Sequence, residues 1–259
     1  MHQPTISNES LTFSILLVLV AIFISHKEKL SLEKDIIWST CRAIIQLLIA
    51  GYILKYIFNV DHELLTIALV MFICVNAAWN AKKRSKYIDK IYVTALIAIT
   101  SGTFLTLLIL ILTNAIAFTP MQVIPITGMI AGNAMIAVGL CFNNLGQRFS
   151  SQQQQIQEML SLGATPKVAS AAIIRDSIRA SLIPTVDSAK TVGIVSLPGM
   201  MSGLIFAGVD PLQAVKYQIM VTFMLLGTAS LSTILAGYMT YTKFYNQRHQ
   251  LLVTTLNKQ

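Results

Sequence analysis

The chain has 259 residues, of which 54% are hydrophobic and only 12% are charged. Soluble domains carry about 25% charged residues. A helix needs about 20 consecutive, mainly apolar residues to cross a bilayer, and the chain contains several runs close to this length. The composition therefore excludes an ordinary soluble domain. It predicts an all-α, polytopic membrane protein, with residues 1–259 forming a single transmembrane domain.

Seven apolar segments are expected to cross the membrane. They lie at about 11–25, 36–57, 64–79, 92–116, 123–142, 192–207 and 219–241. The first segment is short, and residues 6–10 are expected to lengthen it. The N-terminus has no Lys or Arg, and no small-residue cleavage site follows the first run, so this run is interpreted as a retained span.

The basic residues gather on one side of this predicted topology. If the N-terminus lies outside, 16 of the 19 Lys and Arg residues fall in the cytoplasmic regions. Cytoplasmic loops of membrane proteins carry such an excess of positive charge. The distribution therefore predicts an outer N-terminus and a cytoplasmic C-terminus. It also explains the net charge of +8 without a nucleic-acid partner.

The longest polar interruption, at about residues 146–190, is expected to form a cytoplasmic helical hairpin between the fifth and sixth spans. Gly163 can end the first helix in a left-handed conformation. Thr165 can cap the second helix, and Pro166 then occupies its first position, where the missing N–H is harmless. An apolar stripe is expected along the second helix, formed by Val168, Ala171, Ile174, Ile178 and Leu182. Three charged residues lie off that stripe, namely Arg175, Asp176 and Arg179.

Some polar residues fall inside the apolar segments. Arg42 and Gln46 share one face of the second segment, where a charge is costly unless it is paired, hydrated or able to snorkel to the surface. Asn76 and Asn80 share a face of the third segment, and Asn133 lies in the fifth. The Arg42 pattern fits either a translocation path or a side chain that snorkels to the cytoplasmic surface, and the Asn76 pattern fits either a path or helix–helix hydrogen bonding. In the fifth segment the small pair Gly128 and Gly132 fits close helix packing, a substrate path or a dimer seam.

The sixth segment contains a helix breaker. Pro198 cannot donate to the helical hydrogen-bond ladder, and Gly199 follows it directly. Broken spans often mark transport sites, because their backbone groups can face a cavity. Met200 and Met201 come next, and they fit either flexible packing or contacts to a soft metal. The sequence leaves the identity of any metal site unknown.

The chain lacks the GxxxxGK[ST] motif that cradles nucleotide phosphates. If transport is driven by ATP, the nucleotide and its Mg²⁺ must bind a separate subunit, so the chain itself is expected to be neither an enzyme nor a carrier of a cofactor. A secondary transporter or channel that works without such a subunit is the alternative. That class usually keeps acidic residues or an internal repeat within the membrane, and neither is evident here.

The polar interruption resembles the cytoplasmic loop of ABC-type importer permeases, in which a Glu-Ala-Ala motif precedes a Gly and a later Leu-Pro. Glu158, the run Leu162, Gly163 and Ala164, and the pair Ile183 and Pro184 occupy comparable places. Met159 and Leu160 stand where that motif has alanines. The hairpin is therefore expected to couple the chain to an ATPase, through Glu158, Leu162, Gly163, Ala164, Thr165, Pro166, Arg175, Asp176 and Arg179.

Longer stretches resemble the FetB-type iron-export permeases of Gram-negative bacteria and the related plant membrane proteins of aluminium tolerance. They include "NAAWNAKKRSKYI", "MQVIPITGMIAGNAMIAVGLCFNNLGQR" and "LSLGATPKVASAAIIRDSIRASLIPTVDSAKTVGIVSLPGMMSGLIFAG". The resemblance implies an inner-membrane permease, paired with a FetA-type ATP-binding subunit as two permeases and two ATPases. It further implies export of iron or an iron complex and resistance to peroxide stress.

Overall fold

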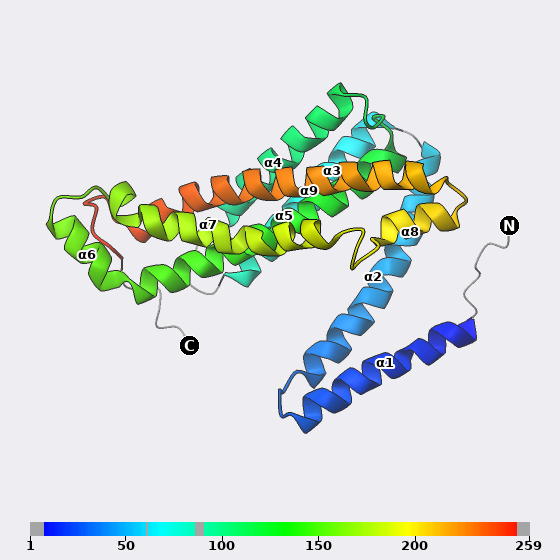
Figure 1. Ribbon diagram of the computed structural model, residues 1–259, viewed down its shortest axis with the longest axis horizontal. Helices are drawn as coiled ribbons and strands as arrows, with labels where there is room; N and C mark the ends of the chain where they lie inside the picture. Colours follow the sequence, from blue (N-terminus) through cyan, green and yellow to red (C-terminus); the bar gives the residue numbers. More distant parts are fainter. Residues whose placement is uncertain (1–7, 61, 86–90, 253–259) are drawn as a thin grey trace. The chain divides into compact units, whose positions relative to one another are not determined.

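The computed structural model describes residues 8–60, 62–85 and 91–252. These residues form nine α-helices and one 3-10 helix, with no strand among them beyond two isolated bridges (Figure 1). The elements are α1 (Asn8–Lys27), α2 (Glu33–Val60), α3 (Glu63–Arg84), α4 (Tyr92–Leu112), α5 (Pro120–Ser151), α6 (Gln153–Ser161), α7 (Pro166–Thr191), α8 (Gly199–Phe206), α9 (Pro211–Thr240) and η1 (Tyr241–Phe244). The predicted all-α class is confirmed.

Five stretches of helix are long and apolar enough to cross a membrane, which confirms the polytopic membrane class. They are Glu33–Ile57, Glu63–Arg84, Tyr92–Leu112, Pro120–Ser151 and Pro211–Phe244. The first predicted span corresponds to the shorter apolar helix Thr12–Lys27 within α1. The predicted orientation, with the N-terminus outside, stays a prediction.

The chain divides into two compact units. The first comprises residues 1–61 and 204–209, and within its described part α1 packs against α2. The turn between these two helices is fixed by a hydrogen bond of 3.2 Å, which the Leu32 N–H donates to the Ser25 hydroxyl. The second unit comprises residues 62–203 and 210–259 and contains the larger helical bundle.

Helix α5 lies at the centre of the second unit. It contacts α3, α4, α7 and α9, and α4 and α9 lie between α3 and α7 around it. More than half of the apolar window of α5 is buried, the largest share among the five candidate spans. The core of the bundle is therefore built around α5.

Small side chains let α3 and α4 approach α5 closely. The buried cluster between these helices is rich in alanine, with Ala77, Ala78, Ala81, Ala95, Ala98, Ala131 and Ala134. Gly128 and Gly132 do not mediate close packing within this bundle, because a Cβ atom at either glycine would meet nothing within 4 Å. Alanines take the role that the glycine pattern predicted.

Helices α4 and α9 meet through small and hydroxyl residues. A Cβ atom at Gly102 would overlap the Ser232 hydroxyl and lie 3.3 Å from the Thr228 carbonyl oxygen. One turn away, the buried Thr106 and Thr228 hydroxyls share a hydrogen bond of 2.7 Å. Each hydroxyl oxygen also lies within hydrogen-bond distance of the carbonyl four residues earlier in its own helix, so one hydroxyl donates to its carbonyl while the other donates across the interface.

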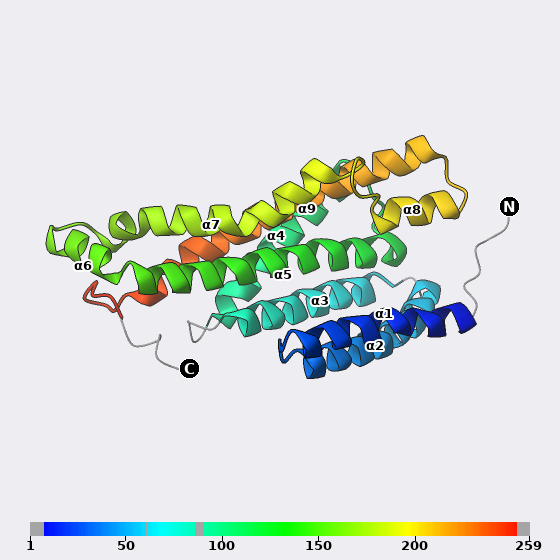
Figure 2. The same cartoon turned by 60° about the horizontal axis from the view of Figure 1, so that its bottom comes forward.

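Helix α7 runs along both α5 and α9, as both ribbon views show (Figures 1 and 2). The Ile178 side chain lies 3.0 Å from the position that a Cβ atom would take at Gly237 of α9, and Cys141 of α5 lies 3.7 Å from it. The Arg84 side chain, at the basic end of α3, lies 2.9 Å from the position that a Cβ atom would take at Gly139 of α5. The predicted helix–turn–helix is therefore present, but the second half of α7 continues beside the membrane-spanning part of α5.

The buried face of α7 differs from the predicted apolar stripe. Ile174 is buried, but Val168 is exposed and Ala171, Ile178 and Leu182 are only half-buried. The residues that α7 buries are Ala169, Ser170, Ile173, Ile174, Ser177 and Ser181. Serines therefore form half of this buried face. The Ser170 and Ser181 hydroxyls have hydrogen-bond partners, whereas the Ser177 hydroxyl has none among the described residues.

The sixth predicted span does not form a membrane-spanning helix. Residues 192–198 are irregular, and only the eight-residue helix α8 follows. Gly193 has a φ of +85°, and its N–H bonds to the Ser196 carbonyl at 2.9 Å, which closes a tight turn. Because Pro198 lies in this irregular segment and not inside a helix, the predicted break occurs before the helix starts. The helix that packs along α5 and α9 after the fifth span is α7, which precedes the predicted sixth span in the sequence.

Gly102→Val should destabilise the protein, because the added side chain would overlap Ser232 and the α9 backbone. Overpacking of this kind costs about 1–3 kcal/mol, which would lower the midpoint of thermal unfolding in detergent. Gly128→Val is the matched control, since the space beside Gly128 is open. Equal midpoints for the two variants would contradict the described packing of α4 on α9.

Candidate functional site

The turn between α6 and α7, residues 162–165, is held by backbone bonds. Gly163 has a φ of +90°, a conformation that favours glycine. Its N–H bonds to the Leu160 carbonyl at 3.0 Å, and the Ala164 N–H bonds to the Met159 carbonyl at 3.0 Å, which together form a Schellman motif. Thr165 is the N-cap of α7 with an extended backbone, and its side chain makes no capping bond. The predicted turn chemistry is confirmed in its glycine, its cap position and its proline.

A compact aromatic cluster supports this turn from inside the unit. The Phe149 ring of α5 stacks on the Phe244 ring of η1, with centroids 3.9 Å apart and planes 5° apart. The Tyr245 hydroxyl and the buried Ser170 hydroxyl of α7 share a hydrogen bond of 2.6 Å. Burial raises the pKa of the Tyr245 phenol, while this hydrogen bond opposes the rise, so the phenol stays neutral. The base of the turn is therefore a packed, uncharged layer.

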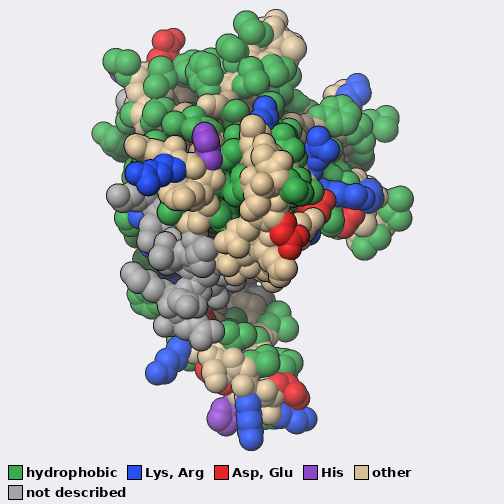
Figure 3. All heavy atoms as spheres, turned by 90° about the vertical axis from the view of Figure 1, so that its left-hand side faces the viewer, with side chains coloured by type: hydrophobic (Ala, Val, Ile, Leu, Met, Phe, Trp, Pro, Cys, Tyr) green, Lys and Arg blue, Asp and Glu red, His purple; other side chains and the backbone are tan. Residues whose placement is uncertain are grey.

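The tip of the turn presents an apolar residue to the surroundings. The Leu162 side chain is 88% exposed, although Leu usually packs inside proteins. Glu158 is also exposed, and it accepts a hydrogen bond of 2.9 Å from Gln154. Figure 3 views the protein from the α6 end and shows Lys, Arg, Asp and Glu side chains gathered around this face. The tip is therefore a rigid turn that carries an exposed leucine, with charged side chains around it.

Arg175, Asp176 and Arg179, the charged residues in the middle of α7, lie on its exposed surface. Asp176 forms an ion pair of 3.3 Å with Arg148 of α5. Arg175 and Arg179 line a groove between α7 and α9 instead of lying beside the turn. The proposed role of these two arginines in ATPase coupling stays a prediction.

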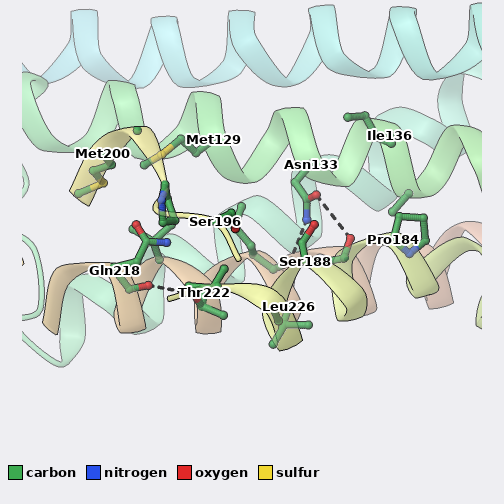
Figure 4. Close-up of a pocket in the computed structure, with 18 of the residues that line it drawn as sticks. Met129, Asn133, Ile136, Pro184, Ser188, Ser196, Met200, Gln218, Thr222 and Leu226 are labelled. Carbon is green, nitrogen blue, oxygen red and sulfur yellow. Dashed lines mark hydrogen bonds between the residues drawn. The ribbon is translucent and has the colours of Figure 1, made fainter. Parts of the chain in front are cut away.

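A cavity of about 640 Å³ lies between α5, α7, the irregular residues 192–198 and α9, all within the second unit (Figure 4). We call it the α5–α7–α9 cavity. Its walls are mainly apolar, and its polar groups are hydroxyls and amides without any formal charge. They are Asn133, Ser181, Thr185, Ser188, Ser196, Gln218 and Thr222. The cavity suits a neutral or charge-compensated ligand more than a bare ion.

Asn133 connects two walls of the cavity. Its amide donates to the Leu225 carbonyl of α9 at 3.3 Å, and its Oδ1 atom accepts from the Thr185 hydroxyl of α7 at 3.5 Å. Near the same end of α7, the Asn144 amide donates to the Ser181 hydroxyl at 3.3 Å. Polar side chains of α5 therefore hold α7 and α9 in register beside the cavity.

Gln218 of α9 is the most unusual polar residue in the cavity wall. It is 6% exposed, yet its Oε1 atom has no hydrogen-bond partner among the described residues. Figure 4 shows its amide directed from α9 towards the segment that carries Met200. A buried amide oxygen without a partner is unfavourable, so the group is available to a ligand or to water. Nothing in the local sequence pattern distinguished it from other residues of an apolar run.

The structure brings some of the predicted path residues together. Asn133, Pro198, Gly199 and Met200 all line the cavity, whereas Met201 does not. The sequence analysis did not identify Ser181, Thr185, Ser188, Ser196, Gln218 or Thr222 as path residues, although their clustering in three adjoining segments is evident once the fold is known.

The remaining path residues lie elsewhere. Asn76 and Asn80 are on α3, where the Asn80 amide bonds within its own helix to the Asn76 Oδ1 atom at 2.7 Å. Arg42 and Gln46 are exposed on α2 in the first unit. Their part in a translocation path stays a prediction.

Ser188→Cys should react with a water-soluble thiol reagent, because Ser188 lines a cavity that we expect to be hydrated. Ser232→Cys should not react, since Ser232 is buried between helices. Both variants are best built on Cys41→Ser, because Cys41 is exposed while Cys74 and Cys141 are buried. Equal labelling of the two sites, or none at Ser188→Cys, would contradict a hydrated cavity.

Comparison with known proteins gives consistent relatives over nearly the whole chain. The chain is 72% identical over 258 residues to the probable iron export permease protein FetB of Escherichia coli (strain K12), covering 100% of both chains. It is 38% identical over 242 residues to the UPF0014 membrane protein YjkA of Bacillus subtilis (strain 168), covering 93% of this chain and 97% of that one. It is 36% identical over 238 residues to Protein ALUMINUM SENSITIVE 3 of Arabidopsis thaliana, covering 92% and 87%.

No solved structure matches the chain. The similarity and the apolar helices identify a multi-pass protein of the bacterial inner membrane. A family model described as "Uncharacterised protein family (UPF0014)" matches residues 8–245. The chain therefore belongs to the UPF0014 family of membrane proteins.

Proposed function

We propose that this chain is the permease subunit of an ATP-driven exporter that moves iron out of the cytoplasm. The 72% identical relative is a probable iron export permease, which supports both the transport role and the cargo. Export of this kind would lower the cytoplasmic iron that reacts with peroxide, so it would contribute to resistance to oxidative stress.

The energy source in this proposal is a separate FetA-type ATP-binding subunit, with two permeases and two ATPases in the assembly. The contact surface on the permease is the α6–α7 turn. Leu162 at its tip is exposed, and the Schellman motif and the aromatic cluster hold the turn rigid. A rigid turn would pass a displacement by the ATP-binding subunit on to α7, whereas a flexible loop would deform and leave α7 in place.

One helix carries the observation on which the mechanism rests. Helix α7 begins at the turn with Pro166 and reaches the cavity wall with Thr185 and Ser188. The 22 residue steps from Pro166 to Ser188 span about 33 Å at 1.5 Å per residue. A displacement of the turn by the ATPase therefore moves one wall of the α5–α7–α9 cavity directly.

Pro184 gives this helix a point of flexure at the cavity. It lies inside α7 and cannot donate a hydrogen bond to the Ala180 carbonyl. Prolines within helices are common sites of kinks. In the proposed alternating-access cycle, α7 bends at Pro184 and the irregular residues 192–198 rearrange with it.

The polar groups of the cavity bear on the form of the cargo. They are hydroxyls and amides, with the thioethers of Met129 and Met200 beside them, and none carries the negative charge that would offset a bare Fe²⁺ ion. The described residues hold no cluster of three or more His, Cys, Asp or Glu that could bind a metal. Iron bound to an organic ligand is therefore the favoured cargo in this proposal.

Leu162→Asp should abolish co-purification of the ATP-binding subunit, because a charge replaces the exposed apolar contact at the tip. Membrane insertion should be unchanged, since Leu162 makes no contact in the core. Leu212→Asp is the matched control, because Leu212 is also exposed and belongs to the first turn of α9, which starts at the end of the bundle opposite α6 (Figure 1). Retention of the ATPase by Leu162→Asp, or transport by the permease alone, would favour a secondary transporter.

Pro184→Ala should slow iron export severalfold while the ATP-binding subunit still co-purifies, because the change restores the hydrogen bond and stiffens α7. Pro211→Ala serves as the control, since Pro211 occupies the first turn of α9 and interrupts no bond. The assay is loss of preloaded ⁵⁵Fe from cells that express both subunits. Unchanged export by Pro184→Ala would argue against bending at this site.

A further inference from the structure

A second hollow, separate from the cavity, lies between α7 and α9 on the surface of the second unit. We call it the α7–α9 groove. It has a volume of about 800 Å³. Its middle is apolar and its two ends are charged. Arg175 and Arg179 lie at one end, and Asp187 and Lys190 lie at the other.

The apolar middle of the groove is open at the surface. Ile183, Val186 and Ile234 are each between 38% and 48% exposed. From Arg175 to Asp187 the groove extends over 12 residues of helix, or about 18 Å. This length is close to the hydrocarbon half of a bilayer, about 15 Å. Its apolar part on α7, from Ile178 to Val186, covers 8 residue steps or about 12 Å, so it accommodates most of an acyl chain of one leaflet.

The two arginines are chemically unpaired. Among the described residues, neither guanidinium group makes a hydrogen bond or ion pair, whereas nearby Asp176 already pairs with Arg148. Arg175 and Arg179 are four residues apart, so they project from the same face of α7. Two free guanidinium groups on one face form a site for an anion, and guanidinium groups bind phosphate in a bidentate manner.

The depth of the arginines matches that of a lipid headgroup. Ile178, between them in sequence, lies against Gly237 of α9, close to Cys141 of α5. Gly139, two residues before Cys141, touches Arg84 at the basic end of α3. Lys82 and Lys83 lie over the Trp79 ring at this same end, as expected at a membrane interface. The arginines therefore lie level with the basic rim of the bundle.

The far end of the groove carries no free charge. Lys190 and Asp187 form an ion pair of 3.0 Å with each other. An occupant therefore meets positive charge at one end, apolar walls in the middle and a neutralised pair at the other end. An anionic phospholipid has this distribution, with its phosphate at one end and its acyl chains beyond.

A second copy of the chain fits the groove less well. Copies of a membrane protein share one orientation, so a two-fold axis between them lies along the membrane normal and like residues meet at equal depth. A seam formed by this groove would bring the arginines of both copies to one level. The nearby Asp176 could not neutralise them, because it already pairs with Arg148. Like charges at such a seam are unfavourable.

We infer that the α7–α9 groove binds an anionic phospholipid, with the phosphate on Arg175 and Arg179 and an acyl chain along Ile183 and Val186. This site does not depend on the cargo or on the ATP-binding subunit. Because α7 also forms a wall of the cavity, a lipid bound there stabilises one position of the helix that the transport proposal moves.

The test uses the full-length protein in mild detergent, with phosphatidylglycerol or phosphatidylcholine added. We expect phosphatidylglycerol alone to raise the midpoint of thermal unfolding by about 5 °C. Arg175→Gln with Arg179→Gln should lose most of this shift and the lipid adduct seen by native mass spectrometry. Val186→Trp keeps both arginines but fills the groove, so this variant should also lose the thermal shift and the lipid adduct.

Lys82→Gln with Lys83→Gln is the matched control, because it removes two charges at the same level without touching the groove. This variant should keep the full shift. Equal loss in both double variants would overturn the site by showing a general charge effect. An equal response to the two lipids would also overturn it. So would a disulfide between copies carrying Arg179→Cys, since it would identify the groove as a subunit seam.

Discussion

The packing of α7 along α5 and α9 is the constraint on which the rest of the structure depends. A polar helix can lie beside apolar spans only if its polar groups find partners inside the bundle. Ser170 bonds to Tyr245, Ser181 receives the Asn144 amide, and Thr185 donates to Asn133. These bonds keep one face of α7 on the core, so its other faces are left to line a cavity and a groove.

The same helix joins three surfaces with different chemistry. Its start forms a rigid turn with an exposed leucine, its middle borders a groove with two free arginines, and its last turns wall an uncharged cavity. A movement of α7 would change all three surfaces together. This geometry explains how a partner at the turn and a lipid in the groove can both act on the cavity without touching a ligand there.

Much of the fold could be predicted because the signals are local. Gly163, Thr165 and Pro166 define a turn through their own conformational preferences, and long apolar runs define spans. The length of α7 in the bundle could not be predicted, because serines that find tertiary partners look like solvated residues in sequence. The loss of the sixth span depends on the turn closed by Gly193 and Ser196, which apolar composition conceals. Gln218 was missed because only the fold shows that its amide faces a cavity without a partner.

The most direct test is a distance measurement across the cavity in the complex with the ATP-binding subunit. Spin labels at Ser188 on α7 and Ile136 on α5 would report the separation of two cavity walls. We predict that the distance distribution shifts between the nucleotide-free complex and one trapped with ATP and vanadate, and that Pro184→Ala suppresses the shift. An unchanged distribution in a complex that hydrolyses ATP and exports iron would contradict the proposal that α7 transmits the power stroke.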